Sequence, residues 1–173
     1  MNPLWWVMAK ERNLAMSCLL KNASSSFRAS ALFLRNVEND GVRHVEERIA
    51  WLRHPQGRIN SAYSHFQFYN NKGKNTQHKI PPSATRDYCT FVDFILAHEN
   101  PHWQPQVELL THEGVYVPTV TERFENLGAR FSHYLKGKLG ISNTSKALPV
   151  DVSYRREALD RKYRADYELW YSL

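Results

Sequence analysis

A short apolar run that ends at an arginine and a proline constrains the fold of this chain more than any other feature. The run spans 49–52, and its length and composition predict a buried strand. Pro55 favours the first turn of a helix, and Ile59, Tyr63 and Phe66 follow at helical spacing. The segment therefore predicts a strand that leads directly into a helix, which is the repeating unit of α/β domains.

The same order of elements occurs earlier in the chain. Residues 13–20 predict a buried strand, 21–26 form a polar turn, and 27–35 predict a helix. A third strand is expected at 115–120, with Pro118 at a strand end or a sheet edge. Strands that alternate with helices favour a parallel sheet.

Further helices are expected at 87–99, 125–139 and 154–171. The polar stretch 69–86 predicts a surface loop. Only three strands are evident, so we expect one more within 1–7 or 108–111. The predicted fold class is α/β, with a small, mostly parallel sheet flanked by helices. The length fits one domain, 1–173.

The first polar turn carries side chains that suit a phosphate group. Lys21 supplies a positive charge, and Ser24, Ser25 and Ser26 supply hydroxyl donors at an expected helix start. Backbone N–H groups and the helix dipole favour an anion at such a position. The turn lacks the glycine pattern of a P-loop. The alternative interpretation is a serine-rich helix cap that binds nothing.

The turn after 49–52 offers a second set of phosphate ligands. Arg53 and Arg58 supply guanidinium groups, which bind phosphate through paired hydrogen bonds, and Ser61 adds a hydroxyl donor. Arg58 could equally form a structural ion pair. The alternative for the whole segment is a strand end with ordinary surface arginines.

Both turns resemble phosphate-binding segments of the sulfotransferases that use 3′-phosphoadenosine 5′-phosphosulfate (PAPS). Residues 21–26 resemble the 5′-phosphosulfate loop Pro-Lys-Thr-Gly/Ala-Ser/Thr-Ser/Thr, from which Leu20 and Asn22 depart. Residues 53–63 resemble the 3′-phosphate segment R-x-P-x-x-R-x-x-S-x-Y. The chain between the two segments is shorter than is usual in that family.

Three downstream segments extend the resemblance to the carbohydrate-modifying group of these enzymes. Residues 100–106 resemble its His-Trp-x-Pro-Gln segment, and 122–127 resemble its (Arg)-x-Glu-Asn-Leu segment, which follows a strand. Residues 143–170 resemble its C-terminal region, so the resemblance covers about 14–170. It implies a P-loop-like three-layer fold.

The resemblance also implies an activity and roles for single residues. The chain would transfer a sulfuryl group from PAPS to a hydroxyl acceptor, for which a carbohydrate is the candidate. Lys21 would stabilise the leaving phosphate, residues 24–26 would hold the 5′-phosphate, and Arg53 and Ser61 would hold the 3′-phosphate. His102 is our first candidate for the base that takes the acceptor proton. This chemistry requires no metal.

Other histidines and acids give weaker hypotheses. Glu108 and His65 are alternative candidates for the base. His98, Glu99 and His102 contain metal-ligating atoms, but Pro101 interrupts the segment and leaves their geometry undefined, and ligand type without geometry is weak evidence for a metal site.

The overall charge and hydropathy narrow the remaining function classes. The formal net charge is +6, which favours anionic ligands without choosing among them. We place nucleic-acid binding last because the sequence has no recognised groove-reading motif. No apolar run is long enough to span a bilayer and the N-terminus lacks a signal-peptide pattern, so we expect a cytoplasmic protein. The main alternative is a non-catalytic protein of this fold with a binding or structural role in a viral or multiprotein assembly. Such a protein could form an oligomer or bind an assembly partner, and it would be virion-associated in the viral case.

Overall fold

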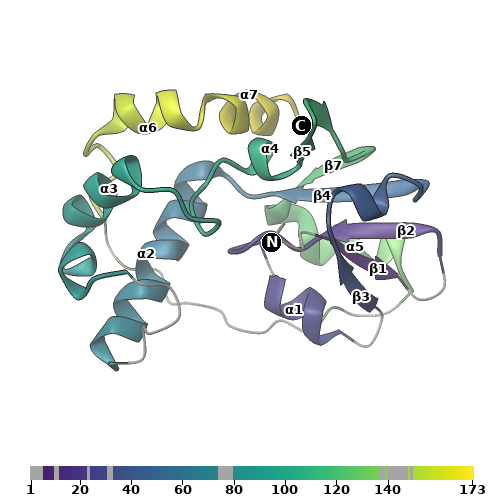
Figure 1. Cartoon of the computed structure of the whole chain (residues 1–173), viewed down its shortest axis with the longest axis horizontal. Coiled ribbons are helices and arrows are strands. Elements are labelled where there is room, and N and C mark those ends of the chain that lie inside the picture. The colour runs from purple at the N-terminus through teal and green to yellow at the C-terminus, as the bar shows by residue number, and fades with distance from the viewer. Residues whose placement is uncertain are drawn as a thin grey trace.

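A computed structural model of the protein shows a five-stranded mixed sheet on one side and a group of helices on the other (Figure 1). It describes residues 6–9, 12–22, 24–30, 33–73, 80–136, 139, 148 and 150–173. The strands are β1 (Trp6–Ala9), β2 (Leu14–Ser17), β3 (Phe33–Val37), β4 (Glu47–Leu52) and β7 (Val120–Arg123).

The order of the strands across the sheet is β3-β1-β2-β4-β7. The neighbours β2, β4 and β7 are parallel, whereas β1 is antiparallel to both β2 and β3. A separate hairpin pairs β5 (Thr111–His112) with β6 (Val115–Tyr116). The predicted α/β class with a small, mostly parallel sheet is therefore confirmed, because β1 alone runs against the other four strands of the sheet.

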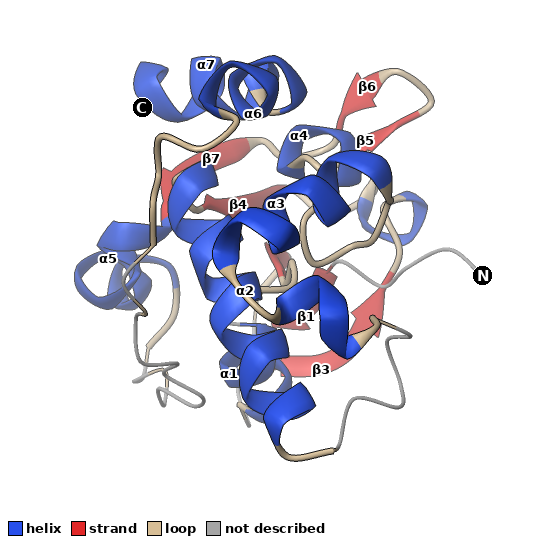
Figure 2. Ribbon diagram, turned by 90° about the vertical axis from the view of Figure 1, so that its left-hand side faces the viewer, coloured by secondary structure: helices blue, strands red, loops and turns tan. Residues whose placement is uncertain are grey.

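The helices are α1 (Ser24–Ala29), α2 (Pro55–Asn71), α3 (Tyr88–Ala97), α4 (Gln106–Leu109), α5 (Leu127–Tyr134), α6 (Arg156–Lys162) and α7 (Arg164–Ser172). Short 3-10 turns lie at Asp40–Val42, Pro82–Thr85 and Phe124–Asn126. Seen from the helical end, α2 and α3 lie in front of the sheet (Figure 2). Phe66 and Trp103 belong to the apolar cluster that joins α2, α3, α6 and α7.

Residues 49–52 of strand β4 are buried on both faces of the sheet, which explains their continuous apolar sequence. Ile49 and Trp51 pack with residues of α1 and α5, whereas Ala50 and Leu52 pack with residues of α4 and the β5–β6 hairpin. Successive side chains of a strand point to opposite faces, so a strand between two layers must be apolar throughout. Its parallel neighbours β2 and β7 place their C-terminal ends beside that of β4.

Several expected elements differ from the observed ones. The additional strand expected within 1–7 is β1, and it pairs with β3, where the sequence predicted the second half of a helix over 27–35. Phe33 lies opposite Ala9 and Val37 lies opposite Trp6, so pairing with β1 prevails over the local helical spacing.

The expected strand at 115–120 combines two elements, because Val115–Tyr116 pairs in the hairpin and Val120 begins β7. The helix expected at 125–139 is limited to α5 among the described residues. The helix expected at 154–171 breaks at Tyr163 into α6 and α7. Among the described residues, no helix combines the length and the apolar composition that crossing a membrane requires.

Candidate functional site

The turn after β2 holds Lys21 in an unusual backbone conformation. Its φ of +72° lies in the left-handed region, which a residue other than glycine adopts at a cost of about 1–2 kcal/mol. The N–H of Asn22 donates to the carbonyl of Leu19 at 3.0 Å and closes the turn. Backbone strain of this kind is often found where a side chain must be aimed at a site.

The amine of Lys21 lies in a poorly solvated, positively charged environment. Burial, and then the charges of Arg53 and Arg58, lower the pKa of Lys21 to about 7. The amine lies 5.9 Å from the centre of the Phe66 ring. Within the described part of the chain, none of these three basic residues forms an ion pair. The site therefore concentrates positive charge that no carboxylate contacts directly.

Arg53 joins the two predicted phosphate-binding segments. Its Nη1 donates to the carbonyl oxygen of Lys21 at 2.9 Å, and its guanidinium lies 5.2 Å from the centre of the Phe124 ring. Burial lowers the pKa of Arg53, while the charge of Glu125 acts in the opposite direction. The contact follows from the sheet, because Lys21 and Arg53 come after the parallel neighbours β2 and β4.

The side chain of Arg58 is buried and bonds to the backbone. Its side chain is 1% exposed, and it donates to three backbone carbonyls, those of Leu20 at 3.2 Å, Pro101 at 2.8 Å and Gln104 at 2.5 Å. These bonds connect the Lys21 turn to the loop that carries His102. Arg58 thus uses its donors on the backbone, and it forms no ion pair with any carboxylate in the described part of the chain.

The serines of the first turn have different surroundings. Ser24 begins α1, and both Ser24 and Ser26 are buried, whereas Ser25 is exposed. Because hydroxyl oxygens at the start of a helix can accept as well as donate, the buried pair can serve either a cap or an anion.

Ser61 lies on the face of α2 between Arg53 and His102. Gly57, Ser61 and His65 are four residues apart, so they share one side of the helix. A Cβ atom at Gly57 would lie 3.6 Å from Nε of Arg53, and the ring of His65 stacks on that of His102 with centroids 5.8 Å apart. Ser61 is half-buried.

His102 is buried beside the same aromatic ring as Lys21. Its exposed fraction is 6%, and its ring meets that of Phe66 edge-on at 4.9 Å. Oδ1 of Asn100 accepts from the backbone N–H of His102 at 3.0 Å and lies 2.8 Å from Nδ1. Since this oxygen can only accept, Nδ1 is the donor in this contact.

The other candidates from the sequence lie elsewhere. Glu108 is exposed on α4. His98 stacks on Phe94 at 4.1 Å, and Glu99 pairs with Lys162 at 2.9 Å, so neither is directed toward His102 by these contacts. Across the described residues, no group of three or more His, Cys, Asp or Glu side chains is placed to hold a metal ion.

Sequence reasoning did not identify two polar residues that organise this region. Gln106 is 1% exposed and bonds to both Asn22 and Arg53, and Asp166 of α7 bonds to Gln106. Gln106 ends the 100–106 segment, but its partners are 53 to 84 positions away, so no local pattern could assign them. Asp166 had no signal beyond its place in a helix.

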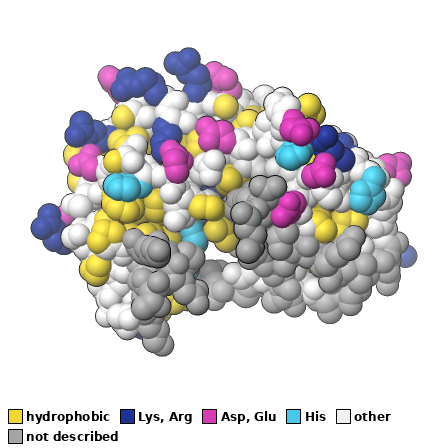
Figure 3. Space-filling view, viewed as in Figure 1, with side chains coloured by type: hydrophobic (Ala, Val, Ile, Leu, Met, Phe, Trp, Pro, Cys, Tyr) yellow, Lys and Arg dark blue, Asp and Glu magenta, His cyan; other side chains and the backbone are white. Residues whose placement is uncertain are grey.

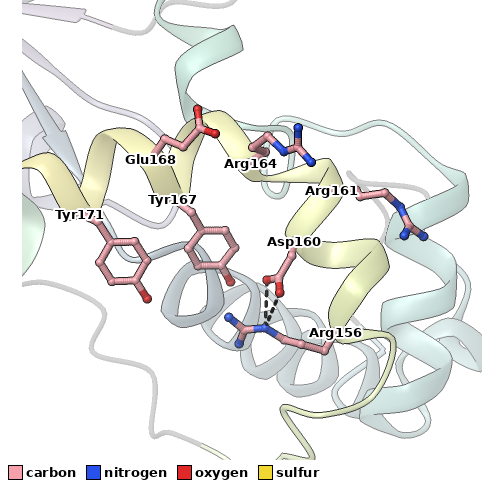
Figure 4. Close-up of a pocket in the computed structure, with 7 residues that line it drawn as sticks. All are labelled: Arg156, Asp160, Arg161, Arg164, Tyr167, Glu168 and Tyr171. Carbon is pink, nitrogen blue, oxygen red and sulfur yellow. Dashed lines mark hydrogen bonds and ion pairs between the residues drawn. The ribbon is translucent and has the colours of Figure 1, made fainter.

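A separate open hollow lies on α6 and α7. It has a volume of about 340 Å³ and is lined by Arg156, Asp160, Arg161, Arg164, Tyr167, Glu168 and Tyr171 (Figure 4). The surface over these helices carries basic side chains with acidic ones between them (Figure 3). None of the site residues predicted from the sequence lines this hollow.

The comparisons with known proteins leave the family of this chain open. No protein-family model, curated protein or solved structure matches it.

Proposed function

We propose that this chain is a sulfotransferase that transfers a sulfuryl group from PAPS to a hydroxyl acceptor, on a P-loop-like fold. The observation that carries the proposal is the bond from Arg53 Nη1 to the carbonyl oxygen of Lys21. It joins the two segments that resemble the phosphate-binding segments of sulfotransferases, at the C-terminal ends of neighbouring parallel strands. Ligands of open α/β sheets commonly bind at such ends.

The charge distribution supports an anionic ligand at this position. Lys21, Arg53 and Arg58 lie near one another, and the two arginines help to lower the pKa of Lys21. A phosphate group would relieve this repulsion and restore the proton of the amine. The positive charge of the two turns therefore supports the binding of a phosphorylated nucleotide. Arg53 and Ser61 would bind the 3′-phosphate, while Lys21 and the serines of α1 would bind the 5′-phosphate.

The proposed sulfuryl transfer needs one bond to break, one bond to form and one group to accept a proton. The sulfur–oxygen bond to the 5′-phosphate breaks as a bond to the acceptor oxygen forms, and the acceptor proton passes to Nε2 of His102. Lys21, in its protonated form, would stabilise the charge that develops on the leaving phosphate. Lys21 and His102 both pack against Phe66, which supports their placement at one reaction centre.

If Lys21 and Arg53 faced separate surfaces, the non-catalytic alternative would be favoured. The bond from Arg53 Nη1 to the Lys21 carbonyl instead brings the two residues side by side, which supports the enzyme. Isothermal titration with adenosine 3′,5′-bisphosphate tests the proposal directly. We expect binding in the micromolar range, and Arg53→Ala should weaken it by about 1.5–3 kcal/mol, since a charged hydrogen bond is lost. Arg12→Ala is a matched control, because Arg12 pairs with Glu47 away from the Lys21 turn. Wild-type protein that binds no nucleotide at high micromolar concentration would refute the proposal.

A further inference from the structure

The side-chain amide of Gln106 connects two segments that are distant in the sequence. Its Oε1 accepts from Nδ2 of Asn22 at 2.6 Å and from the backbone N–H of Arg53 at 3.0 Å. Its Nε2 donates to the carbonyl of Arg53 at 2.8 Å. One amide thus pairs with both backbone groups of Arg53 and also holds the residue that follows Lys21.

Asn22 is fixed from a second side as well. Its Nδ2 also donates to the carbonyl oxygen of Trp51 in β4 at 2.7 Å, and the whole residue is buried. The turn after β2 is therefore attached to the end of β4 through Asn22 and Gln106 together. Buried amide bonds of this kind hold a fixed geometry, because breaking one leaves a buried polar atom without a partner.

Asp166 of the C-terminal helix determines how the Gln106 amide is oriented. Its Oδ2 accepts from the backbone N–H of Gln106 at 2.7 Å and from Nε2 at 3.2 Å, and its Oδ1 accepts from the N–H of Val107 at 2.8 Å. A carboxylate accepts but does not donate, so the amide nitrogen must face Asp166 and the amide oxygen must face Asn22. Asp166 is 1% exposed, so water does not compete for these bonds.

We propose that Gln106, held by Asp166, is a positioning residue that sets the spacing between the Lys21 turn and Arg53. This proposal rests on the proposed function, since it assumes that the two segments bind two phosphates of one nucleotide. It predicts a specific consequence. The spacing matters for a ligand that carries both phosphates and matters little for a ligand that carries one, because only the former must satisfy both segments at once.

The test compares adenosine 3′,5′-bisphosphate with adenosine 5′-monophosphate in calorimetric titrations. Gln106→Met keeps the length of the side chain and removes its amide. We expect Gln106→Met to reduce the preference for the bisphosphate by about tenfold or more, with little change in affinity for the monophosphate. Loss of both affinities to the same extent would indicate general structural damage and overturn the proposal. Gln104→Ala is the matched control, because among the described residues only the backbone of Gln104 forms hydrogen bonds.

Native-state hydrogen exchange provides a readout that does not depend on nucleotide binding. The N–H of Arg53 should exchange at least about tenfold faster in Gln106→Met, whereas that of Trp51, which donates to Ser17 Oγ at 3.1 Å, should not change. If Gln106→Met does not fold, Asp166→Asn loosens the same amide and takes its place in both experiments.

The two experiments separate the two proposals. If the wild type binds neither nucleotide, the proposed function fails. Hydrogen exchange at the Arg53 N–H then decides whether Gln106 holds Arg53 in place beside the Lys21 turn. Unchanged exchange there, or an unchanged preference for the bisphosphate in a folded variant, would overturn the positioning role.

Discussion

Replacing Lys21 with methionine should stabilise the protein while removing nucleotide binding. The amine of Lys21 is desolvated next to two arginines, and its pKa falls from 10.5 to about 7. At about 1.4 kcal/mol per pKa unit, this shift corresponds to an upper value of about 5 kcal/mol. Lys21 retains some contact with solvent, so we expect about 2 kcal/mol of stabilisation at pH 6 in Lys21→Met. Both side chains carry the same strain at positive φ, so the backbone term cancels.

The lowered pKa of Lys21 also determines how the stability of the protein changes with pH. The folded protein binds the Lys21 proton less tightly than the unfolded chain does, so wild-type stability should rise as the pH increases from about 7 towards 10.5. The advantage of Lys21→Met should therefore be largest below pH 7 and shrink across that window. Urea denaturation at several pH values measures the free energy of unfolding for both proteins, and their difference cancels the other titrating groups.

Residues that bind ligands often lower the stability of the folded protein. We therefore expect Lys21 to destabilise the fold and to be required for nucleotide binding. The reasoning would be refuted if Lys21→Met were less stable than wild type at pH 6. It would also fail if the difference between the two proteins did not change between pH 6 and pH 10.

Four further predictions concern neighbouring residues. Arg58→Met should destabilise the fold by about 3 kcal/mol, since it leaves three partly buried carbonyls without their charged donor. Arg58→Lys should not restore the loss in urea denaturation. Affinity for adenosine 3′,5′-bisphosphate should fall by up to about tenfold per pH unit above pH 7, because an uncharged Lys21 must take up a proton on binding. In calorimetric titrations, Lys21→Arg should remove this pH dependence. Gly57→Ala should raise the free energy of unfolding by up to about 1 kcal/mol with affinity nearly unchanged, since the added Cβ makes an ordinary contact with Arg53. His102→Asn should lower the rate of sulfuryl transfer by about 100-fold while nucleotide affinity, measured by titration, stays the same.

The helical spacing after Pro55 and the buried run before it were sufficient to predict β4 and α2. Both predictions rest on local causes: a strand buried on two faces is apolar throughout, and proline fits the first turn of a helix. The same spacing argument was wrong for the segment that contains Phe33, because pairing with β1 is a non-local interaction that local periodicity does not contain.

The sequence by itself predicted two phosphate-binding segments, because Lys21 and Arg53 each follow an apolar run. Only the tertiary structure decided that the two residues touch, because the spatial order of β2 and β4 arises from pairing along the whole sheet. It also decided that Arg58 binds backbone carbonyls and that Gln106 meets Asp166 from 60 positions away. Charge and hydroxyl content are properties of single residues, whereas the partner of a buried polar group depends on which segments the fold brings together.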